Sequence, residues 1–150
     1  MGELRLVELD ASNIVAANSM TLKPGQDAFV APVSHSIAEA YVNPGAAWPR
    51  VVLDGEKIVG FVMGNFDESH PQEEFRSALL RINVEGDRQG QGIGRFAAEA
   101  LLEEARKRGF DHVTAVWDHG ELGPEKFFLK IGFVLVGETQ YGEAIGEIKV

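Results

Sequence analysis

The sequence predicts an α/β (α+β) protein, a three-layer α/β/α sandwich around a central mixed, mostly antiparallel sheet. Three observations support this prediction. Short apolar runs with strand periodicity alternate with amphipathic helical segments. The pair Asp54-Gly55 joins two apolar runs and indicates an antiparallel hairpin. A glycine-rich loop separates an alternating apolar run over residues 78–84 from a long amphipathic helix.

The first half of the chain is predicted to contain three strands and two helices. The strands are expected over residues 4–10, 50–53 and 57–66, and the helices are expected to end near Met20 and Val42. Asp10, Ser12 and Asn13 are candidate N-caps of the first helix. Ser36 and Glu39 lie three residues apart and form the pattern of a capping box, which predicts that the second helix begins there.

The second half continues with helix, strand, helix and a closing hairpin. The long helix should run from about Gly92 to Gly109, with the core-facing stripe Ile93, Phe96, Ala97, Ala100 and Leu101. A strand is expected over 112–118, a short helix over 124–131, and hairpin strands over 133–139 and 144–150. Pro124 suits the first turn of the short helix.

Composition limits the class of protein. The 150 residues fit one domain, 1–150, and contain no apolar run near the roughly 20 residues of a membrane-spanning helix. The start of the chain lacks a signal-peptide core, and there is no cysteine, which together favour the cytoplasm. The net charge of −9 argues against nucleic acid. It suits a cationic small molecule, or serves solubility alone.

Residues 84–95 carry the strongest chemical signal. Gly90, Gly92 and Gly94 alternate where the strand gives way to the helix, so that a ligand can approach bare amides and the positive end of the helix dipole. This arrangement is typical of a phosphate site. A strict dinucleotide fingerprint would need glycine where Arg95 stands, and its looser form, ending at Ala97, does not follow a first strand. A Walker loop does not fit either.

The run Gln89-Gly90-Gln91-Gly92-Ile93-Gly94 resembles the acetyl-coenzyme A pyrophosphate loop of the GNAT superfamily of N-acetyltransferases. The alternative is that the glycines serve only tight packing of strand and helix. Residues 57–61 and 127–133 also resemble this family. Weaker similarities, to diamine and polyamine (spermidine/spermine) N-acetyltransferases, lie at 29–32, at 36–41 and in the closing hairpin.

The resemblance implies a binding site for acetyl-CoA, the co-substrate. The residues implied to hold its pyrophosphate are Gln89, Gly90, Gln91, Gly92, Ile93, Gly94 and Arg95. Ile82, Asn83 and Val84 would pair with the pantetheine arm, and the Val84 amide would meet the thioester oxygen. Phe128 stands in the late motif where the family commonly has a tyrosine that protonates the leaving thiolate.

The catalytic groups are the open part of this interpretation, because phenylalanine has no proton to donate. Water can protonate a thiolate whose reference pKa is ~8.5, or Tyr141 serves instead, or the chain binds coenzyme A without catalysis. The remaining candidates are His35, His119 and Glu121, the histidines because they titrate near neutral pH. The carboxylates available to attract a cationic amine are Glu39, Glu74, Glu121, Glu138 and Glu147.

These observations lead to an expected function. It is acetyl transfer from acetyl-CoA to a primary amine of a small cationic substrate, with a polyamine as the leading acceptor. An antibiotic amine, a protein N-terminus and an inactive coenzyme A-binding domain are the alternatives. No metal is expected, since the H-E-x-x-H pattern is absent. No nucleic acid or membrane partner is expected, and a homodimer is a further implication of the family.

Overall fold

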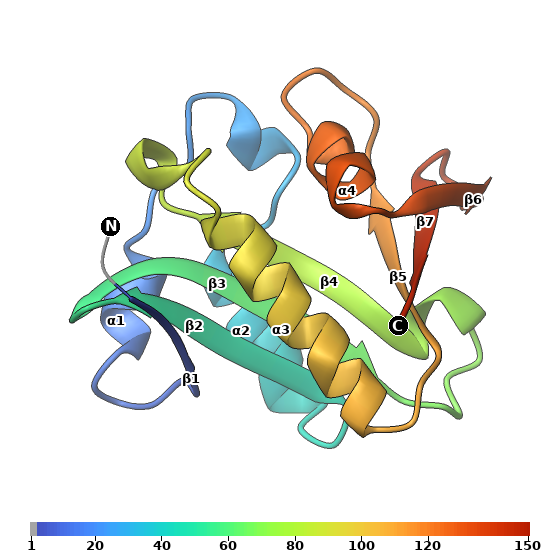
Figure 1. Cartoon of the computed structure of the whole chain (residues 1–150), viewed down its shortest axis with the longest axis horizontal. Helices are drawn as coiled ribbons and strands as arrows, with labels where there is room; N and C mark the ends of the chain where they lie inside the picture. The colour runs from blue at the N-terminus through green and yellow to red at the C-terminus, as the bar shows by residue number, and fades with distance from the viewer. Residues whose placement is uncertain (1–2) are drawn as a thin grey trace.

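The computed structural model describes residues 3–150 and shows a twisted sheet of seven strands with helices on both faces (Figure 1). The strands are β1 (Leu4–Val7), β2 (Ala47–Asp54), β3 (Lys57–Phe66), β4 (Ser77–Val84), β5 (His112–Trp117), β6 (Val134–Glu138) and β7 (Ala144–Lys149). The helices are α1 (Ile14–Asn18), α2 (Val33–Val42), α3 (Ile93–Lys107) and α4 (Glu125–Ile131). Short 3-10 turns occupy Gln26–Ala28, Glu73–Phe75 and Gly86–Arg88.

The sheet is mixed, in the order β1-β2-β3-β4-β5-β7-β6. Neighbours from β1 to β4 are antiparallel, whereas β4 and β5 are parallel. The predicted fold class is therefore confirmed, and so is the hairpin at Asp54-Gly55, where Gly55 has a φ of 64°. The parallel pair is short: only Ala78 with Thr114 and Leu79 with Ala115 are in register.

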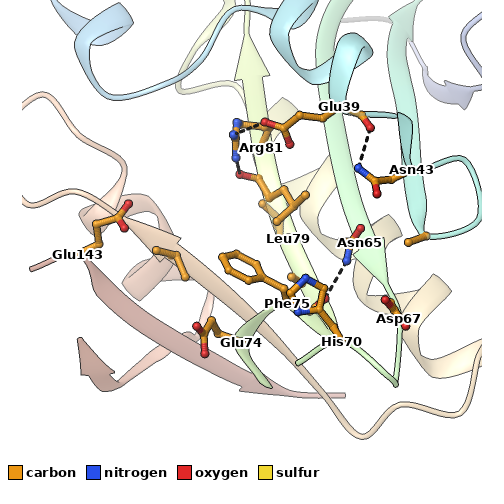
Figure 2. A pocket seen from close by; sticks show the side chains of 14 residues that line it. Glu39, Asn43, Asn65, Asp67, His70, Glu74, Phe75, Leu79, Arg81 and Glu143 are labelled. Carbon is orange, nitrogen blue, oxygen red and sulfur yellow. Dashed lines mark hydrogen bonds and ion pairs between the residues drawn. The ribbon is translucent and has the colours of Figure 1, made fainter. Parts of the chain in front are cut away.

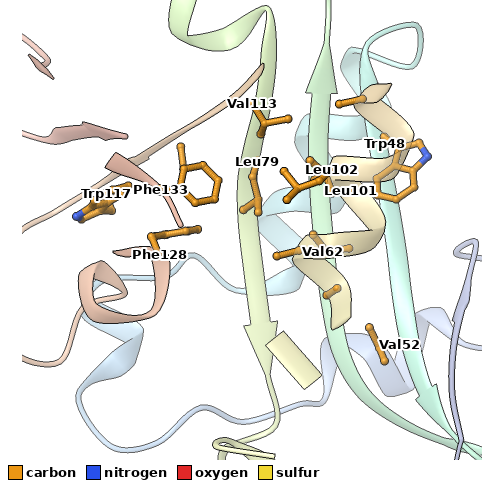
Figure 3. Packing of buried hydrophobic residues seen from close by; sticks show 14 of the residues in the cluster. Trp48, Val52, Val62, Leu79, Leu101, Leu102, Val113, Trp117, Phe128 and Phe133 are labelled. Carbon is orange, nitrogen blue, oxygen red and sulfur yellow. The ribbon is translucent and has the colours of Figure 1, made fainter. Parts of the chain in front are cut away.

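The main core lies between the sheet and α3 (Figure 3). Ile93, Ala97 and Leu101 of the predicted stripe are buried, whereas Phe96 and Ala100 are only partly buried. Two glycines of β3 let the helix approach: a Cβ on Gly60 would lie 3.1 Å from Ile93 Cγ2, and one on Gly64 would lie 2.9 Å from Leu101 Cδ1. A smaller cluster, between the sheet and α1 and α2, covers the opposite face.

The capping box predicted at Ser36 and Glu39 is wrong. α2 begins three residues earlier, at Val33, because Pro32 (φ −64°) is suited to the position that precedes the first turn. Ser36 is consequently in the second turn, fully buried, and its Oγ has no hydrogen-bond partner in the described part of the chain.

The start of α1 also differs from the prediction. Asn13 occupies the N-cap position but caps nothing: its Oδ1 accepts from the Asp10 amide at 2.9 Å, and its Nδ2 donates to the Glu8 carbonyl at 3.0 Å. The Ser12 hydroxyl and amide donate to the Asp10 carboxylate, and these hydrogen bonds lower the pKa of Asp10. These polar side chains therefore stabilise the turn before α1 rather than its first amides.

Several other boundaries shift by a few residues. β1 ends at Val7 instead of residue 10, and β2 begins at Ala47 rather than residue 50. Pro124 occupies the N-cap of α4, one position before its first turn. Local patterns specify the type of each element better than its ends, because capping and packing partners from elsewhere decide where a helix or strand stops.

Candidate functional site

A cleft opens where β4 and β5 diverge. Their pairing stops after Leu79, and the register between β3 and β4 skips Leu80, which marks a bulge in β4. The Glu85 amide donates to the Val59 carbonyl of β3 at 3.0 Å. Because consecutive amides of a strand point to opposite edges, the amides of Val84 and Ile82 face the open edge toward β5. The edge between residues 80 and 84 is thus free to pair with a ligand.

The glycine-rich loop lies at the wide end of this cleft. Gly90 and Gly92 have φ values of 79° and 88°, a conformation that favours glycine, and a Cβ on either would meet nothing within 4 Å. Gly92 is the N-cap of α3, so the first amides of that helix are exposed beside it. Open space beside helix amides that lack intrahelical partners is the geometry expected of an anion cradle.

Gly94 has a different role, because it is already inside the helix. A Cβ there would lie 2.8 Å from Cε1 of Phe127, a residue of α4. The absence of a side chain at Gly94 allows α3 and α4 to approach each other. The packing role considered as an alternative for all three glycines therefore applies to this one.

Side chains hold the loop in place from three directions. Gln89 Nε2 donates to the Val84 carbonyl at 3.0 Å and to Gln26 Oε1 at 2.8 Å. Arg88 forms an ion pair with Asp54 at the β2–β3 hairpin. Glu85 accepts from the amide and hydroxyl of Thr21, at 3.2 and 3.0 Å. Gln89 and Arg88 are therefore occupied in shaping the loop.

The loop borders a groove of about 370 Å³ that runs between β4 and α4. Of the predicted cofactor residues, those that line it are Ile82, Val84, Gln89, Gly90, Gly92, Gly94 and Arg95. Lys130 of α4 also lines it, and the described residues of its wall include no carboxylate. The groove thus combines bare amides with two cations, Lys130 and Arg95, of which Arg95 also forms an exposed ion pair with Glu99 at 3.5 Å. This combination suits a phosphorylated ligand.

The other predicted cofactor residues lie elsewhere. The Ile93 side chain is buried in the core, and Gln91 is exposed and accepts from Arg88 Nε at 3.1 Å. Asn83 is buried and donates to the Ala31 carbonyl at 3.1 Å. Phe128 is buried and stacks on Trp117, with ring centroids 4.9 Å apart. Seven of the eleven predicted cofactor residues thus line the groove, and the side chains of these four point elsewhere.

A second cavity, of about 330 Å³, continues the groove along the cleft. It shares Val30, Ile82 and Pro124 with the groove, and Phe128 forms part of its wall. Residues 27–31, which follow the first helix, form another part of that wall. The ring of Phe128, which stands where the family commonly has a tyrosine, therefore lies beside the open edge of β4.

A third cavity, of about 410 Å³, lies beyond it and is acidic (Figure 2). Its acidic side chains come from α2, the β3–β4 connection and the β6–β7 hairpin, and they are Glu39, Asp67, Glu74 and Glu143. Arg81 is the one arginine or lysine among its described lining residues, and it is paired with Glu39 at 2.9 Å. His70 also lines the cavity, and its ring lies edge-on to Phe75.

The acidic cavity and the middle cavity meet at one junction. The four residues that line both are Leu80, Arg81, Val116 and Glu143. The junction therefore lies where β4 bulges and separates from β5. The three cavities adjoin one another in series, from the glycine loop, along the open edge of β4, to a cluster of carboxylates.

The four predicted catalytic candidates lie outside the walls of these cavities, although His35 contacts Glu39, the partner of the junction residue Arg81. His35 and His119 are held by carboxylates, His35 by Glu39 at 2.7 Å and His119 by Glu125 at 3.1 Å. Tyr141 is 79% exposed at the turn of the β6–β7 hairpin, and Glu121 is exposed in the loop before α4. These four residues line none of the three cavities.

Sequence reasoning missed His70 and Glu143. Of the carboxylates it singled out, Glu39 and Glu74 line the acidic cavity, whereas Glu121, Glu138 and Glu147 do not. Glu143 directly precedes β7 in the predicted hairpin. Its position at the end of a strand was the only feature of the sequence that could have marked it as a site residue. The sequence alone does not show that the hairpin turn reaches the end of β5.

Within residues 3–150, no helix has the length and apolar character needed to cross a membrane. In the same range, no three His, Asp or Glu side chains are grouped as metal ligands.

The chain belongs to the acetyltransferase (GNAT) family, whose model matches residues 19–133. Fold and site agree with that membership: a mixed sheet splits beside a glycine loop at a helix N-terminus. Among solved structures, an acetyltransferase from Thermus thermophilus has a TM-score of 0.77 at 20% identity, over 98% of this chain and 97% of that one. The PaiA N-acetyltransferase from Thermoplasma acidophilum, solved with coenzyme A, has a TM-score of 0.74 at 13% identity, over 99% of both chains. At these identities the likeness shows the fold.

Two characterised acetyltransferases are similar to this chain in sequence, at 26–27% identity. N-acetyltransferase 8F1 of Rattus norvegicus is 27% identical over 114 residues, which are 73% of this chain and 51% of that protein. The L-methionine sulfoximine/L-methionine sulfone acetyltransferase of Pseudomonas aeruginosa is 26% identical over 119 residues, 77% of this chain and 69% of that protein. This chain spans about half the length of the mammalian relatives it matches.

Proposed function

We propose that this protein transfers the acetyl group of acetyl-CoA to a primary amine of a small cationic acceptor. The observation that carries the proposal is the series of adjoining cavities, which has cations and bare amides at one end and carboxylates at the other. A negatively charged cofactor and a positively charged acceptor would enter from opposite ends. Their reacting groups would meet between β4 and β5.

The cofactor would lie in the groove beside the glycine loop. Its pyrophosphate would accept hydrogen bonds from the amides around Gly90 and Gly92 and from the first turn of α3, next to Arg95 and Lys130. Its pantetheine arm would extend along the open edge of β4, where no strand competes for the amides. This placement is supported by the free edge and by the absence of carboxylates among the described groove residues.

We infer that the Ile82 amide, rather than the Val84 amide predicted from the sequence, would meet the thioester oxygen. Both amides face the open edge, but Val84 is bound to the loop through Gln89, and Ile82 lies two residues closer to the junction. The pantetheine arm is long, so its sulfur would lie well beyond the loop. Val84 would then hold the arm, while Ile82 would stabilise the negative charge that develops on the oxygen.

The acceptor would occupy the acidic cavity. With Arg81 neutralised by Glu39, three carboxylates remain to attract cations, those of Asp67, Glu74 and Glu143. Several carboxylates along one cavity favour an acceptor with more than one positive charge, such as a diamine or polyamine. Amino acids such as L-methionine sulfoximine, the compound in the name of one relative, would instead need a free cation for their carboxylate.

A second candidate function is binding of coenzyme A without catalysis. It is favoured by Phe128, which provides no proton for the leaving thiolate and whose ring is buried against Trp117. In the first function, water reaching the middle cavity would protonate the thiolate, whose reference pKa of ~8.5 permits departure near neutral pH.

A thiol-release assay separates the two functions. The purified protein is incubated with acetyl-CoA and a panel of amines: a polyamine, a diamine, a monoamine, an aminoglycoside, L-methionine sulfoximine and a peptide N-terminus. Thiol release that is fastest with the polyamine or diamine supports the proposal. If acetyl-CoA binds in calorimetry but no amine releases thiol above background, the binding function stands and the enzymatic one is rejected.

We further propose that the protein is located in the cytoplasm and forms a homodimer. The absence of cysteine suits a reducing compartment. The edge strand β6 exposes Val134, Leu135 and Val136, and β6 of a second copy would pair with it antiparallel about a twofold axis. Light scattering of the wild type and of Leu135→Lys tests the dimer: a dimer that the substitution converts to a monomer supports it, and a monomeric wild type rejects it.

A further inference from the structure

We propose that Glu143 is the residue that binds the acceptor ammonium and takes its proton. This inference rests on the proposed function and adds a specific catalytic residue to it. Glu143 is the one acidic residue that lines both the acidic cavity and the middle cavity, among the residues the structure describes. It therefore lies where an acceptor and a thioester would come into contact.

The carboxylate of Glu143 is held in position and remains available. The Thr139 hydroxyl donates to Glu143 Oε1 at 3.2 Å, and the Glu143 amide donates to the same hydroxyl oxygen at 3.2 Å. No lysine, arginine or histidine within residues 3–150 forms an ion pair with it. Figure 2 shows this side chain on the hairpin, across the cavity from Arg81.

The other titratable groups nearby are less suited to this step. Glu39 is shared by Arg81 and His35, so its charge is already compensated. Asp67, His70 and Glu74 line the acidic cavity but not the middle cavity, on the far side of the junction from the cofactor path. Asp27 and Asp118 line the middle cavity but not the acidic cavity. Glu143 alone combines both positions.

The proposed step balances as follows. The acceptor ammonium gives one proton to Glu143, and the neutral nitrogen forms a bond to the thioester carbon while the carbonyl electron pair moves to oxygen. As the carbonyl re-forms, the carbon–sulfur bond breaks and the thiolate leaves with its electron pair. The nitrogen loses its second proton, which water in the middle cavity passes to the thiolate, and Glu143 releases its proton to solvent. Acetyl-CoA and an alkylammonium thus become an N-alkylacetamide, coenzyme A thiol and one proton.

Turnover of Glu143→Gln, Glu143→Asp and Glu138→Gln with the best amine tests this role. Glu138 is the matched control, because it is an exposed glutamate of the same hairpin outside the cavities. The loss of a general base lowers kcat by about 100-fold in Glu143→Gln at pH 7. The Asp variant retains a carboxylate and is intermediate, and the control stays within about twofold of wild type.

A pH profile excludes a merely structural effect. The deficit of Glu143→Gln should shrink between about pH 7 and 9, because an amine with a reference pKa of ~10.4 increasingly arrives without its extra proton. Affinity for acetyl-CoA and the melting temperature should not change. The proposal is overturned if Glu143→Gln keeps wild-type turnover, or if its deficit is the same at every pH.

Binding of the amine to the protein with coenzyme A distinguishes failure of this inference from failure of the proposed function. Glu143→Gln should weaken that binding about tenfold or more, since a charge-assisted hydrogen bond is lost. If the wild type transfers acetyl groups and the variant does so equally, the function stands and Glu143 is rejected. If the wild type shows no transfer but Glu143-dependent binding, the contact stands and the transfer fails. If neither occurs, both are rejected.

Discussion

The groove beside the glycine loop and the acidic cavity are built by different means. One continuous stretch of chain, the end of β4, the loop and the start of α3, supplies 7 of the 16 residues that line the groove, and the backbone amides exposed there belong to this stretch. The acidic cavity is made of side chains from α2, the β3–β4 connection, β4 and the β6–β7 hairpin. The first arrangement would hold a cofactor through backbone geometry, as proposed above. The second allows the acceptor to change through substitution of a few side chains without disturbing the cofactor.

The largest expected effect is in the groove. Gly92→Asp places a carboxylate and a Cβ in the anion cradle, and it should weaken acetyl-CoA binding about 100-fold, or ~2.7 kcal/mol. Gly109→Asp is the matched control, because Gly109 has nearly the same φ (89° against 88°) and equally open space at the other end of α3. Calorimetry should find acetyl-CoA affinity unchanged in the control. Equal affinities in the two variants would remove the loop from the cofactor site.

A smaller effect is expected in the acidic cavity. The double variant Asp67→Asn, Glu74→Gln should raise KM for a polyamine about tenfold, since two partly solvated charge pairs are lost. The KM for a monoamine should change less, and acetyl-CoA affinity should not change. Steady-state kinetics at two ionic strengths measures this, because the wild-type KM should rise with salt. A uniform change for all amines would contradict a cavity that binds a second cationic group.

The next prediction concerns Phe128, which lies between the two regions. Phe128→Tyr restores a hydroxyl beside the open edge of β4 and should raise kcat roughly threefold if protonation of the thiolate limits the rate. Acetyl-CoA affinity should remain the same. Turnover is measured with amine and acetyl-CoA saturating. An unchanged kcat would mean that water already protonates the thiolate fast enough.

The smallest effect is on stability. Gly94→Ala should lower the unfolding free energy by about 1 kcal/mol, because contact with the Phe127 ring outweighs the helix propensity gained. In a Phe127→Ala background the same substitution should instead stabilise, since nothing opposes the gain in propensity. Urea unfolding of the four proteins measures this reversal. A loss of stability in both backgrounds would show that Phe127 is not the reason for glycine.

The difference between the two regions also explains how much could be predicted from sequence. Residues 89–95 are contiguous, so their spacing alone indicated a phosphate cradle, and the 3.6-residue stripe indicated the helix that follows. Glu143 and Glu74 are 69 positions apart and meet only because β4 and β5 pair briefly and then diverge. Ser36 and Glu39 show a different limit of sequence reasoning. Their spacing matches a capping box, but the helix already begins at Val33, so neither residue caps it.

A bisubstrate ligand, coenzyme A joined through an acetyl linker to the best amine acceptor, tests most directly whether the two regions share one reaction site. Calorimetry should find it bound at least about 100-fold more tightly than coenzyme A, because both ends engage at once. Gly92→Asp and Glu143→Gln should each reduce its affinity, with nearly additive free energies as expected for separate contacts. Affinity equal to that of coenzyme A, with no effect of Glu143→Gln, would contradict a path on which acceptor and cofactor meet at the β4–β5 junction.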